Sequence, residues 1–321
     1  MARSRGRALG CTAAALSLAL ILGGSALPAH RPSWDDAEWS VFHHKVAWAL
    51  AQRLDTVPMG DAMAALGRTF VGTPYVPNTL DPPGPERLVI GFRGLDCVTF
   101  VENVLALARF VHEPGARELV ERREEAESRY EQILTRIRYR NGELQGYASR
   151  LHYFSDWIAD GEAKELVQDM TPALGGVGES GAVDFMGTHP DAYRQLVEDP
   201  MALASIRDME RRLSAAGRWW IPEDVLDEAA PGIHDGDIIA MTSTVPGMDV
   251  AHTGLALWVG GSLRLMHAPM VGDSVEISTE ALPQRVRRIR GQDGIMVARP
   301  CDGTASCPPR VPLFLRGGRG E

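Results

Sequence analysis

The stretch around which this chain is organised reads Gly94-Leu95-Asp96-Cys97-Val98-Thr99-Phe100-Val101-Glu102-Asn103. Aspartate is a favoured N-cap residue, and the apolar residues that follow Asp96 recur at helical spacing, so a helix is predicted to begin at about Cys97. The unpaired N–H groups and the positive dipole end of a helix start favour a thiolate, which predicts a lowered pKa for Cys97. The alternative is a buried cysteine that serves as a small hydrophobic residue. This stretch alone does not choose between a nucleophile and a core residue.

The composition is that of an ordinary globular protein. The 321 residues are 45% hydrophobic and 23% charged, which suffices for one large core with a substantial insertion. The 42 acidic and 33 basic residues give a formal charge of −9. Proteins that bind nucleic acid or anionic membranes through their surface charge are usually basic. We therefore expect neither nucleic acid nor a membrane surface as a partner.

The N-terminus has the pattern of an export signal. Three arginines precede an apolar run over residues 12–22, and small residues follow the run. This pattern predicts a signal peptide over residues 1–29, cleaved after Ala26 or Ala29, and a protein exported to the periplasm or the extracellular space. The run is short for the ~20 residues of a membrane-spanning helix, so no stable span is expected after cleavage.

The cysteines fit an oxidising compartment. Cys301 and Cys307 are close enough in sequence to close a small disulfide loop, with two free thiols as the alternative. Cys97 is then unpaired, and an unpaired thiol in an exported chain is a candidate nucleophile. No metal or cofactor is expected: the cysteines lack the Cys-x-x-Cys spacing of zinc sites, and the neighbours His43 and His44 cannot face one metal from a single helix.

Helical patterns dominate the first two thirds of the chain, and alternating patterns dominate the last third. Residues 34–70 predict two helical segments, residues 88–92 a short strand, and residues 106–228 a mostly helical region. After residue 231, short apolar runs separated by glycine, proline and aspartate turns predict an antiparallel sheet. We therefore expect an α+β fold in which helices precede a β-meander.

Two histidines are predicted to share one face of this sheet. Val259-Gly260-Gly261-Ser262 has the pattern of a two-residue hairpin turn, and counting back from it pairs Gly254 with His267. His252 is two residues from Gly254, so the two imidazoles become diagonal neighbours, whereas a three-residue loop would put them on opposite faces. Cysteine catalysis needs a base and a group that orients it, which makes Cys97, His252 and His267 a candidate triad.

The motifs of the chain support a family resemblance. The first set comprises Gly72-Thr73-Pro74-Tyr75, Asp96-Cys97, Ala251-His252-Thr253-Gly254 and Met266-His267-Ala268. In this order they resemble the NlpC/P60 superfamily of papain-like cell-wall cysteine peptidases. The second set comprises Leu95–Glu102, His152–Ile158, Phe185–Pro190 and Gly236–Ala240. These segments look like the DUF1460 branch, which is N-acetylmuramoyl-L-alanine amidase-like.

The resemblance implies a papain-like NlpC/P60 fold, in which the nucleophile lies at a helix N-terminus packed on the antiparallel sheet. It implies one catalytic domain over residues 30–321 with a helical insertion at about 110–230. The implied activity is that of an exported cysteine amidase, which cuts the N-acetylmuramoyl-L-alanine bond of peptidoglycan fragments such as anhydromuropeptides. The alternatives are a γ-D-glutamyl-diamino acid endopeptidase and a non-catalytic peptidoglycan-binding module. Val98 stands where the endopeptidases commonly have serine, and they lack the insertion, which favours the amidase.

The expected site has a catalytic set and a substrate-binding set. In the catalytic set Cys97 is the nucleophile, His252 the base and His267 the residue that orients the base. The backbone N–H of Cys97 and the hydroxyl of Tyr75 are expected to hold the oxyanion. Aromatic faces with polar groups between them suit a sugar ring, and the cluster of Tyr153, Phe154, Asp156 and Trp157 is expected to supply such a wall. The substrate-binding set comprises Asp96, Tyr153, Asp156 and Trp157, with Trp219 and Trp220 beside them.

Overall fold

The structure is a computed structural model that describes residues 34–270 and 273–302. The predicted signal peptide over residues 1–29 lies outside the described residues, and so does Cys307. Cys301 is disulfide-bonded, but its predicted pairing with Cys307 remains a prediction. Among the described residues, no helix combines the length and the apolar character needed to cross a bilayer.

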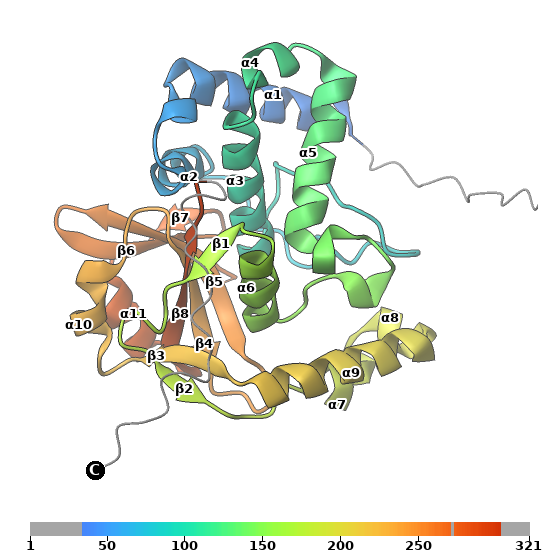
Figure 1. Cartoon of the computed structure of the whole chain (residues 1–321), viewed down its shortest axis with the longest axis vertical. Coiled ribbons are helices and arrows are strands. Elements are labelled where there is room, and N and C mark those ends of the chain that lie inside the picture. Colours follow the sequence, from blue (N-terminus) through green and yellow to red (C-terminus); the bar gives the residue numbers. More distant parts are fainter. Residues whose placement is uncertain (1–33, 271–272, 303–321) are drawn as a thin grey trace, which may run out of the picture. The chain divides into compact units, whose positions relative to one another are not determined.

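The helices of the N-terminal half gather around the one that begins at Cys97. In chain order they are α1 (Asp36–Ala51), α2 (Met59–Arg68), α3 (Cys97–Val111), α4 (Ala116–Leu119), α5 (Arg123–Arg138), α6 (Phe154–Ala163), α7 (Phe185–Thr188), α8 (Arg194–Glu198), α9 (Pro200–Ala216), α10 (Leu226–Ala229) and α11 (Leu282–Arg288). Helix α3 runs between α2 and α5 and also contacts α1 and the sheet (Figure 1). The two helices predicted within residues 34–70 are confirmed as α1 and α2.

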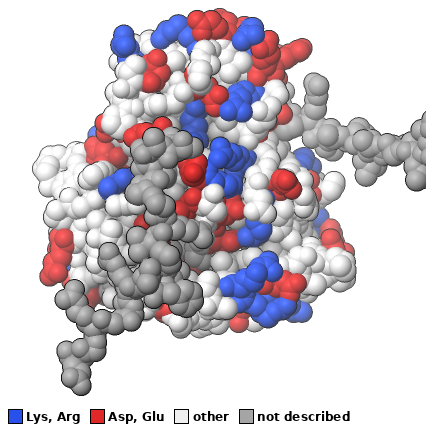
Figure 2. Space-filling model, in the orientation of Figure 1, with Lys and Arg blue, Asp and Glu red and all other residues white. Residues whose placement is uncertain are grey.

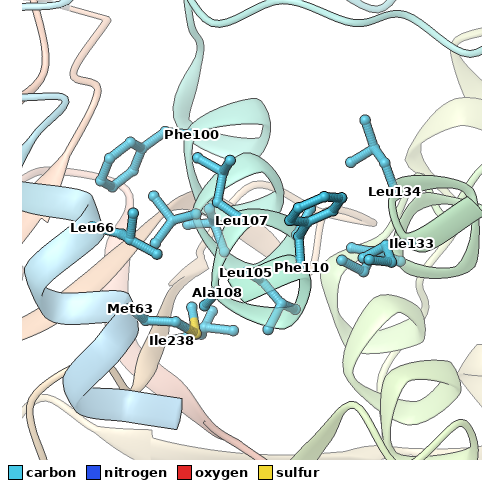
Figure 3. Packing of buried hydrophobic residues seen from close by; sticks show 14 of the residues in the cluster. Met63, Leu66, Phe100, Leu105, Leu107, Ala108, Phe110, Ile133, Leu134 and Ile238 are labelled. Atoms are coloured by element: carbon cyan, nitrogen blue, oxygen red, sulfur yellow. The ribbon is translucent and has the colours of Figure 1, made fainter. Parts of the chain in front are cut away.

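Helix α3 is central because 12 of its 15 residues are buried, nine of them apolar and distributed around the helix. A helix that is hydrophobic on all sides is stable only inside a protein. Figure 3 shows its two contact faces, one against Met63 and Leu66 of α2 and the other against Ile133 and Leu134 of α5. Its buried carboxylate, Glu102, accepts a hydrogen bond from Arg138 of α5 at 2.7 Å. The helix that begins at Cys97 is therefore held rigidly on several sides.

The prediction of a strand over residues 88–92 is wrong. This segment is irregular, although it is apolar and packs against the helices. Its backbone groups bond to side chains from three helices: the N–H of Phe92 to Glu38 at 2.6 Å, the carbonyl of Val89 to Arg138 at 2.7 Å, and the carbonyl of Gly91 to Asn103 at 3.1 Å. Buried backbone groups need partners, and side chains supply them here in place of a neighbouring strand.

The sheet is antiparallel throughout its described pairings, which confirms the α+β prediction. Its strands are β1 (Val167–Asp169), β2 (Val177–Glu179), β3 (Arg218–Pro222), β4 (Ile238–Ser243), β5 (Val250–Val259), β6 (Ser262–His267), β7 (Glu276–Ile277) and β8 (Gln292–Pro300). They follow the order β2-β3-β8-β4-β5-β6-β7, and β1 also pairs with β8.

The sheet departs from the prediction in two ways. Strands β1, β2 and β3 lie in the region predicted as a mostly helical insertion, and β3 pairs directly with β8. The final strand β8 does not extend the meander β4-β5-β6-β7 but inserts between β3 and β4. Its residues 294–298 form one unbroken buried run, and such a strand is stable only where both of its edges and both of its faces are covered.

The sheet separates two hydrophobic cores. Ile238 and Ala240 of β4 pack with α2 and α3, whereas Ile239 and Met241 pack with the helices that follow β3 and β7. This alternation is the two-residue period of a strand. Outside the cores, Figure 2 shows acidic and basic side chains interspersed on the face displayed, with no broad field of one sign.

Candidate functional site

Cys97 begins helix α3 because Asp96 caps the helix. Oδ1 of Asp96 accepts a hydrogen bond from the N–H of Thr99 at 2.8 Å, and Oγ1 of Thr99 accepts one from the N–H of Asp96 at 2.9 Å. This reciprocal pair is a capping box, and it confirms the predicted helix start. The thiol of Cys97 interacts with the backbone N–H groups of Val98 and of Thr253 in β5. The sulfur therefore lies against the strand that carries His252.

The predicted low pKa of Cys97 is wrong. Burial raises the pKa of the Cys97 thiol to about 12, and the negative charge of Asp96 adds to the rise. The N–H groups of Cys97, Val98 and Thr253 lower the pKa but do not outweigh burial. Removal of the thiol from water disfavours its charged form more strongly than the helix start favours it. The resting thiol is therefore protonated at neutral pH and needs a base to become a nucleophile.

The hairpin between β5 and β6 has the predicted register. Val259 pairs with Ser262, and the two turn residues Gly260 and Gly261 have φ values of 58° and 78°. Positive φ at both central positions is the requirement of a two-residue type I′ turn, and glycine meets it without strain. The register runs back to the pair Leu255–Met266. This turn therefore determines which residues of β5 and β6 share a face.

The two histidines meet as this register requires. His252 Nε2 and His267 Nδ1 are 2.7 Å apart, and the two rings are nearly perpendicular, with centroids 4.8 Å apart. Gly254 allows this close approach, since a Cβ there would lie 2.7 Å from the carbonyl oxygen of Met266 and 2.9 Å from Cβ of His267. A side chain at position 254 would push the two strands apart and separate the imidazoles.

Both imidazoles are neutral at pH 7. Burial lowers the pKa of His252 to about 4, and the positive charge of Arg285 in α11 lowers it further. Burial, then His252 and Arg285, lower the pKa of His267 to about 2. One proton therefore lies between the two rings, and it belongs either to His252 Nε2 or to His267 Nδ1. Arg285 is distant in sequence from both histidines, and no local pattern indicated its role.

Tyr75 lies beside the nucleophile because its loop pairs with the residues before Cys97. The carbonyl of Pro74 accepts the N–H of Leu95, and the N–H of Val76 donates to the carbonyl of Leu95, both at 3.0 Å. Burial raises the pKa of Tyr75, and electrostatic interactions with Cys97 and Asp96 raise it further. The phenol therefore keeps its proton and stays a hydrogen-bond donor within electrostatic reach of the thiol.

The two carboxylate oxygens of Asp96 accept hydrogen bonds from different segments, one from the first turn of α3 and one from the loop that precedes the helix in the chain. While Oδ1 caps α3, Oδ2 accepts a hydrogen bond from the hydroxyl of Thr79 at 3.0 Å. Sequence reasoning missed Thr79, which lies in a turn-rich loop with no periodicity. Across residues 34–270 and 273–302, no group of three or more histidine, cysteine or acidic side chains is arranged to hold a metal ion.

The predicted sugar-binding wall of Tyr153, Asp156 and Trp157 is wrong, because these side chains are buried and bound within the protein. Tyr153 donates to Glu210 at 2.7 Å and accepts from the N–H of Met186 at 2.9 Å. Asp156 accepts two hydrogen bonds from Arg140, at 2.8 and 2.6 Å. Trp157 is 2% exposed and stacks on Phe154. A wall for a sugar needs exposed ring faces, and of the predicted aromatics only the half-buried Trp219 and Trp220 on β3 retain exposed surface.

The chain is similar to known proteins over most of its length. Residues 65–295 match the family model described as AmiA-like, N-acetylmuramoyl-L-alanine amidase-like. A crystal structure of an N-acetylmuramoyl-L-alanine amidase from Bacteroides uniformis has a TM-score of 0.68 and 35% sequence identity, and the match covers 76% of this chain and 99% of that one. No curated protein sequence matches.

Two further structures are similar. A Bacteroides fragilis protein described provisionally as a xylanase has a TM-score of 0.65 and 36% identity, over 73% of this chain and 98% of that one. A Legionella pneumophila protein with a DUF1460 family model has a TM-score of 0.58 over 83% of this chain and 93% of that one. At 19% identity, this last similarity supports the fold alone.

Proposed function

Because the chain belongs to the N-acetylmuramoyl-L-alanine amidase-like family, we propose that it is an exported cysteine amidase of the NlpC/P60 type. Its substrate is a muramoyl peptide from peptidoglycan, and the bond cut joins N-acetylmuramic acid to L-alanine. One observation carries the proposal: the 2.7 Å pair of His252 and His267 lies on the hairpin whose strand β5 contacts the Cys97 thiol. A thiol with a base and an orienting group is what cysteine-based acyl transfer requires.

The first half of the reaction transfers the muramoyl group to the enzyme. His252 Nε2 is engaged by His267, which leaves Nδ1 of His252 to accept the thiol proton as sulfur attacks the amide carbon. The carbonyl oxygen gains negative charge, and the N–H of Cys97 with the hydroxyl of Tyr75 stabilises it. The C–N bond then breaks, His252 returns the proton to the nitrogen of L-alanine, and a thioester remains on Cys97.

The second half releases the sugar. Water attacks the thioester carbon while His252 Nδ1 accepts one of its protons, and the same donors hold the oxyanion. The C–S bond breaks, the proton passes from His252 to the sulfur, and a muramic acid carboxyl group leaves. The site returns to a neutral thiol and a neutral imidazole, which is the resting state that burial favours.

Replacing Tyr75 by phenylalanine tests the second oxyanion donor. Loss of one such donor typically lowers kcat by roughly a hundredfold to a thousandfold, and we expect a fall of about tenfold to a thousandfold because the Cys97 N–H remains. KM should change little, since the bond forms to the developing oxyanion rather than to the bound substrate. Steady-state kinetics on a muramoyl peptide measure both constants. A rise in KM with unchanged kcat would make Tyr75 a substrate-binding residue.

The pH profile tests the lowered pKa of His252, whose value of about 4 follows from burial and from Arg285. A general base works only in its neutral form, so the acid limb of kcat/KM should lie near pH 4. At pH 5 about nine tenths of the base is then active, against ~3% for an imidazole with the ordinary pKa of about 6.5. The measurement is kcat/KM between pH 3.5 and 8, and half-loss near pH 6.5 would contradict it.

This profile needs a folding control. His267 is buried and His252 half-buried, both as neutral rings, and their folded pKa values lie below the unfolded value. Below about pH 6.5 the unfolded chain therefore binds protons that the folded chain does not, so these groups make stability fall as the pH falls. Circular dichroism at each pH separates loss of the base from loss of the fold.

A defined set of muropeptides tests the substrate. Mass spectrometry of the products should show release of a peptide that begins with L-alanine from an N-acetylmuramoyl or anhydromuramoyl peptide. The same peptide without its sugar should remain intact, because it lacks the amide bond that is cut. Cleavage of the free peptide between D-glutamate and the diamino acid would contradict the amidase proposal and support an endopeptidase. Binding to peptidoglycan without any turnover would support a non-catalytic binding module.

A further inference from the structure

The orienting histidine has a neighbour on the next strand. His267 pairs directly with Glu276 across β6 and β7, and Oε1 of Glu276 lies 3.5 Å from Nε2 of His267. His267 is completely buried, and its Nε2 has no hydrogen-bond partner of normal length. The Glu276 side chain is 50% exposed. A buried ring nitrogen that carries a proton needs an acceptor, and the carboxylate of Glu276 is the acceptor within reach of a small side-chain adjustment.

We propose that Glu276 is a positioning residue that fixes the proton on His267 Nε2 and, through His267, the tautomer of His252. The inference deepens the proposed function and rests on it. When Nε2 of His267 donates to Glu276, Nδ1 of the same neutral ring has no proton and must accept from His252 Nε2. The Nδ1 atom of His252 is then free of a proton and can accept the one from the thiol.

The opposite arrangement is inactive. If the proton of His267 sat on Nδ1, that atom would donate to His252 Nε2, and the neutral His252 ring would carry its own proton on Nδ1. It could not then accept a proton from Cys97. The 2.7 Å distance between the rings is compatible with either direction of this hydrogen bond. The choice therefore depends on what the far side of His267 contacts, and Glu276 lies on that side.

Burial and the charges around His252 and His267 keep both rings neutral, so Glu276 affects which ring nitrogen carries the proton and not the charge of the ring. Arg285 on α11 acts electrostatically on both rings and on Glu276, and its Nη1 lies 3.6 Å from Glu280. The residue after His252, Thr253, contacts the Cys97 thiol at the start of α3 beside Asp96, and the loop of Tyr75 bonds to residues just before Glu276. Since burial and Arg285 hold both imidazoles neutral, the carboxylate of Glu276 selects which nitrogen carries the proton rather than adding a second one.

Two substitutions and a matched control test the proposal. Glu276→Ala removes the acceptor, and Glu276→Lys puts a donor in its place, which favours the inactive tautomer more strongly. Glu280→Ala removes a carboxylate that also acts on Arg285 but has no contact with His267. Glu276 is half-exposed, so folding should persist, and thermal unfolding of all three variants checks this. If one Glu276 variant fails to fold, the other still carries the test.

The direct readout is the ¹⁵N NMR spectrum of the histidine ring nitrogens in the purified protein. Wild type and Glu280→Ala should show Nδ1 of His252 without a proton, and both Glu276 variants should shift His252 towards the Nδ1–H form. The rate of Cys97 alkylation by iodoacetamide between pH 5 and 9 should fall in the Glu276 variants. We expect kcat to fall by about tenfold to a hundredfold with KM unchanged, the size typical of partners that orient a functional histidine.

The outcomes separate this inference from the proposed function. An unchanged histidine tautomer in both Glu276 variants overturns the inference, and so does an equal effect of Glu280→Ala, which would reveal a general response to charge. The NMR and alkylation measurements need no substrate. If the wild-type protein cleaves no muramoyl peptide but the tautomer shifts as described, the proposed substrate fails while the role of Glu276 stands.

Discussion

Replacing Cys97 by serine is expected to reduce turnover of a muramoyl peptide by a factor of about 10³ or more, as is typical for removal of a catalytic nucleophile. A serine hydroxyl holds its proton far more tightly than a thiol. His252, whose pKa is lowered to about 4, is too weak a base to compensate. Initial rates with the same substrate at several enzyme concentrations measure the loss. Retention of more than about a hundredth of the wild-type rate would remove Cys97 from the mechanism.

Two controls accompany this variant. Serine is close to cysteine in size, and the capping box of Asp96 and Thr99 does not involve the sulfur, so thermal unfolding should match that of the wild type. Cys97 is the free cysteine of the described residues. Alkylation of the native protein followed by peptide mapping should therefore label position 97, and the label should disappear in the serine variant.

Replacing His252 by alanine should be nearly as damaging as the loss of the nucleophile. The thiol is protonated at neutral pH, since burial raises the pKa of Cys97 to about 12, and without a base it stays unreactive. His267→Asn should cost less, because an amide can still hold His252 by a hydrogen bond. Steady-state kinetics of the single variants, and of the double variant Cys97→Ser/His252→Ala, measure these effects.

The double variant decides whether the two residues act as a unit. Members of one catalytic unit give strongly non-additive losses, so the double variant should be about as slow as either single one. Small and equal losses at His252 and His267 would instead show that the pair is structural. Additive losses at Cys97 and His252 would argue that the histidine acts on a different step from the cysteine.

Short-range patterns were sufficient to predict part of the site. The start of α3 depends on Asp96 and Thr99, three residues apart, and the facing histidines depend on the two-glycine turn at Gly260 and Gly261. Both are consequences of local backbone geometry, where side-chain period and cap chemistry operate over a few residues. The pairing of His252 with His267 could therefore be counted from the turn without knowledge of the rest of the fold.

These local patterns did not show which side chains are buried in the folded protein. Tyr153 and Trp157 were predicted to face a ligand, but the packing of α6 and α9 encloses them. Residues 88–92 have the composition of a strand, yet side chains of three helices bind their backbone groups. In both cases the deciding contacts come from residues far away in the chain, and no local period reports them.

Local sequence patterns identify the residues that could carry the chemistry: an unpaired thiol after a helix cap, and two histidines on one side of a hairpin. The electrostatic state of these residues follows from the packing of the whole chain around them. Burial raises the pKa of Cys97 and lowers the pKa of His252, because loss of contact with water destabilises the charged form of each group more than its neutral form. It also brought Arg285 and Glu276 to the histidine pair, since packing of α11 and β7 against β6 is a long-range consequence of core formation.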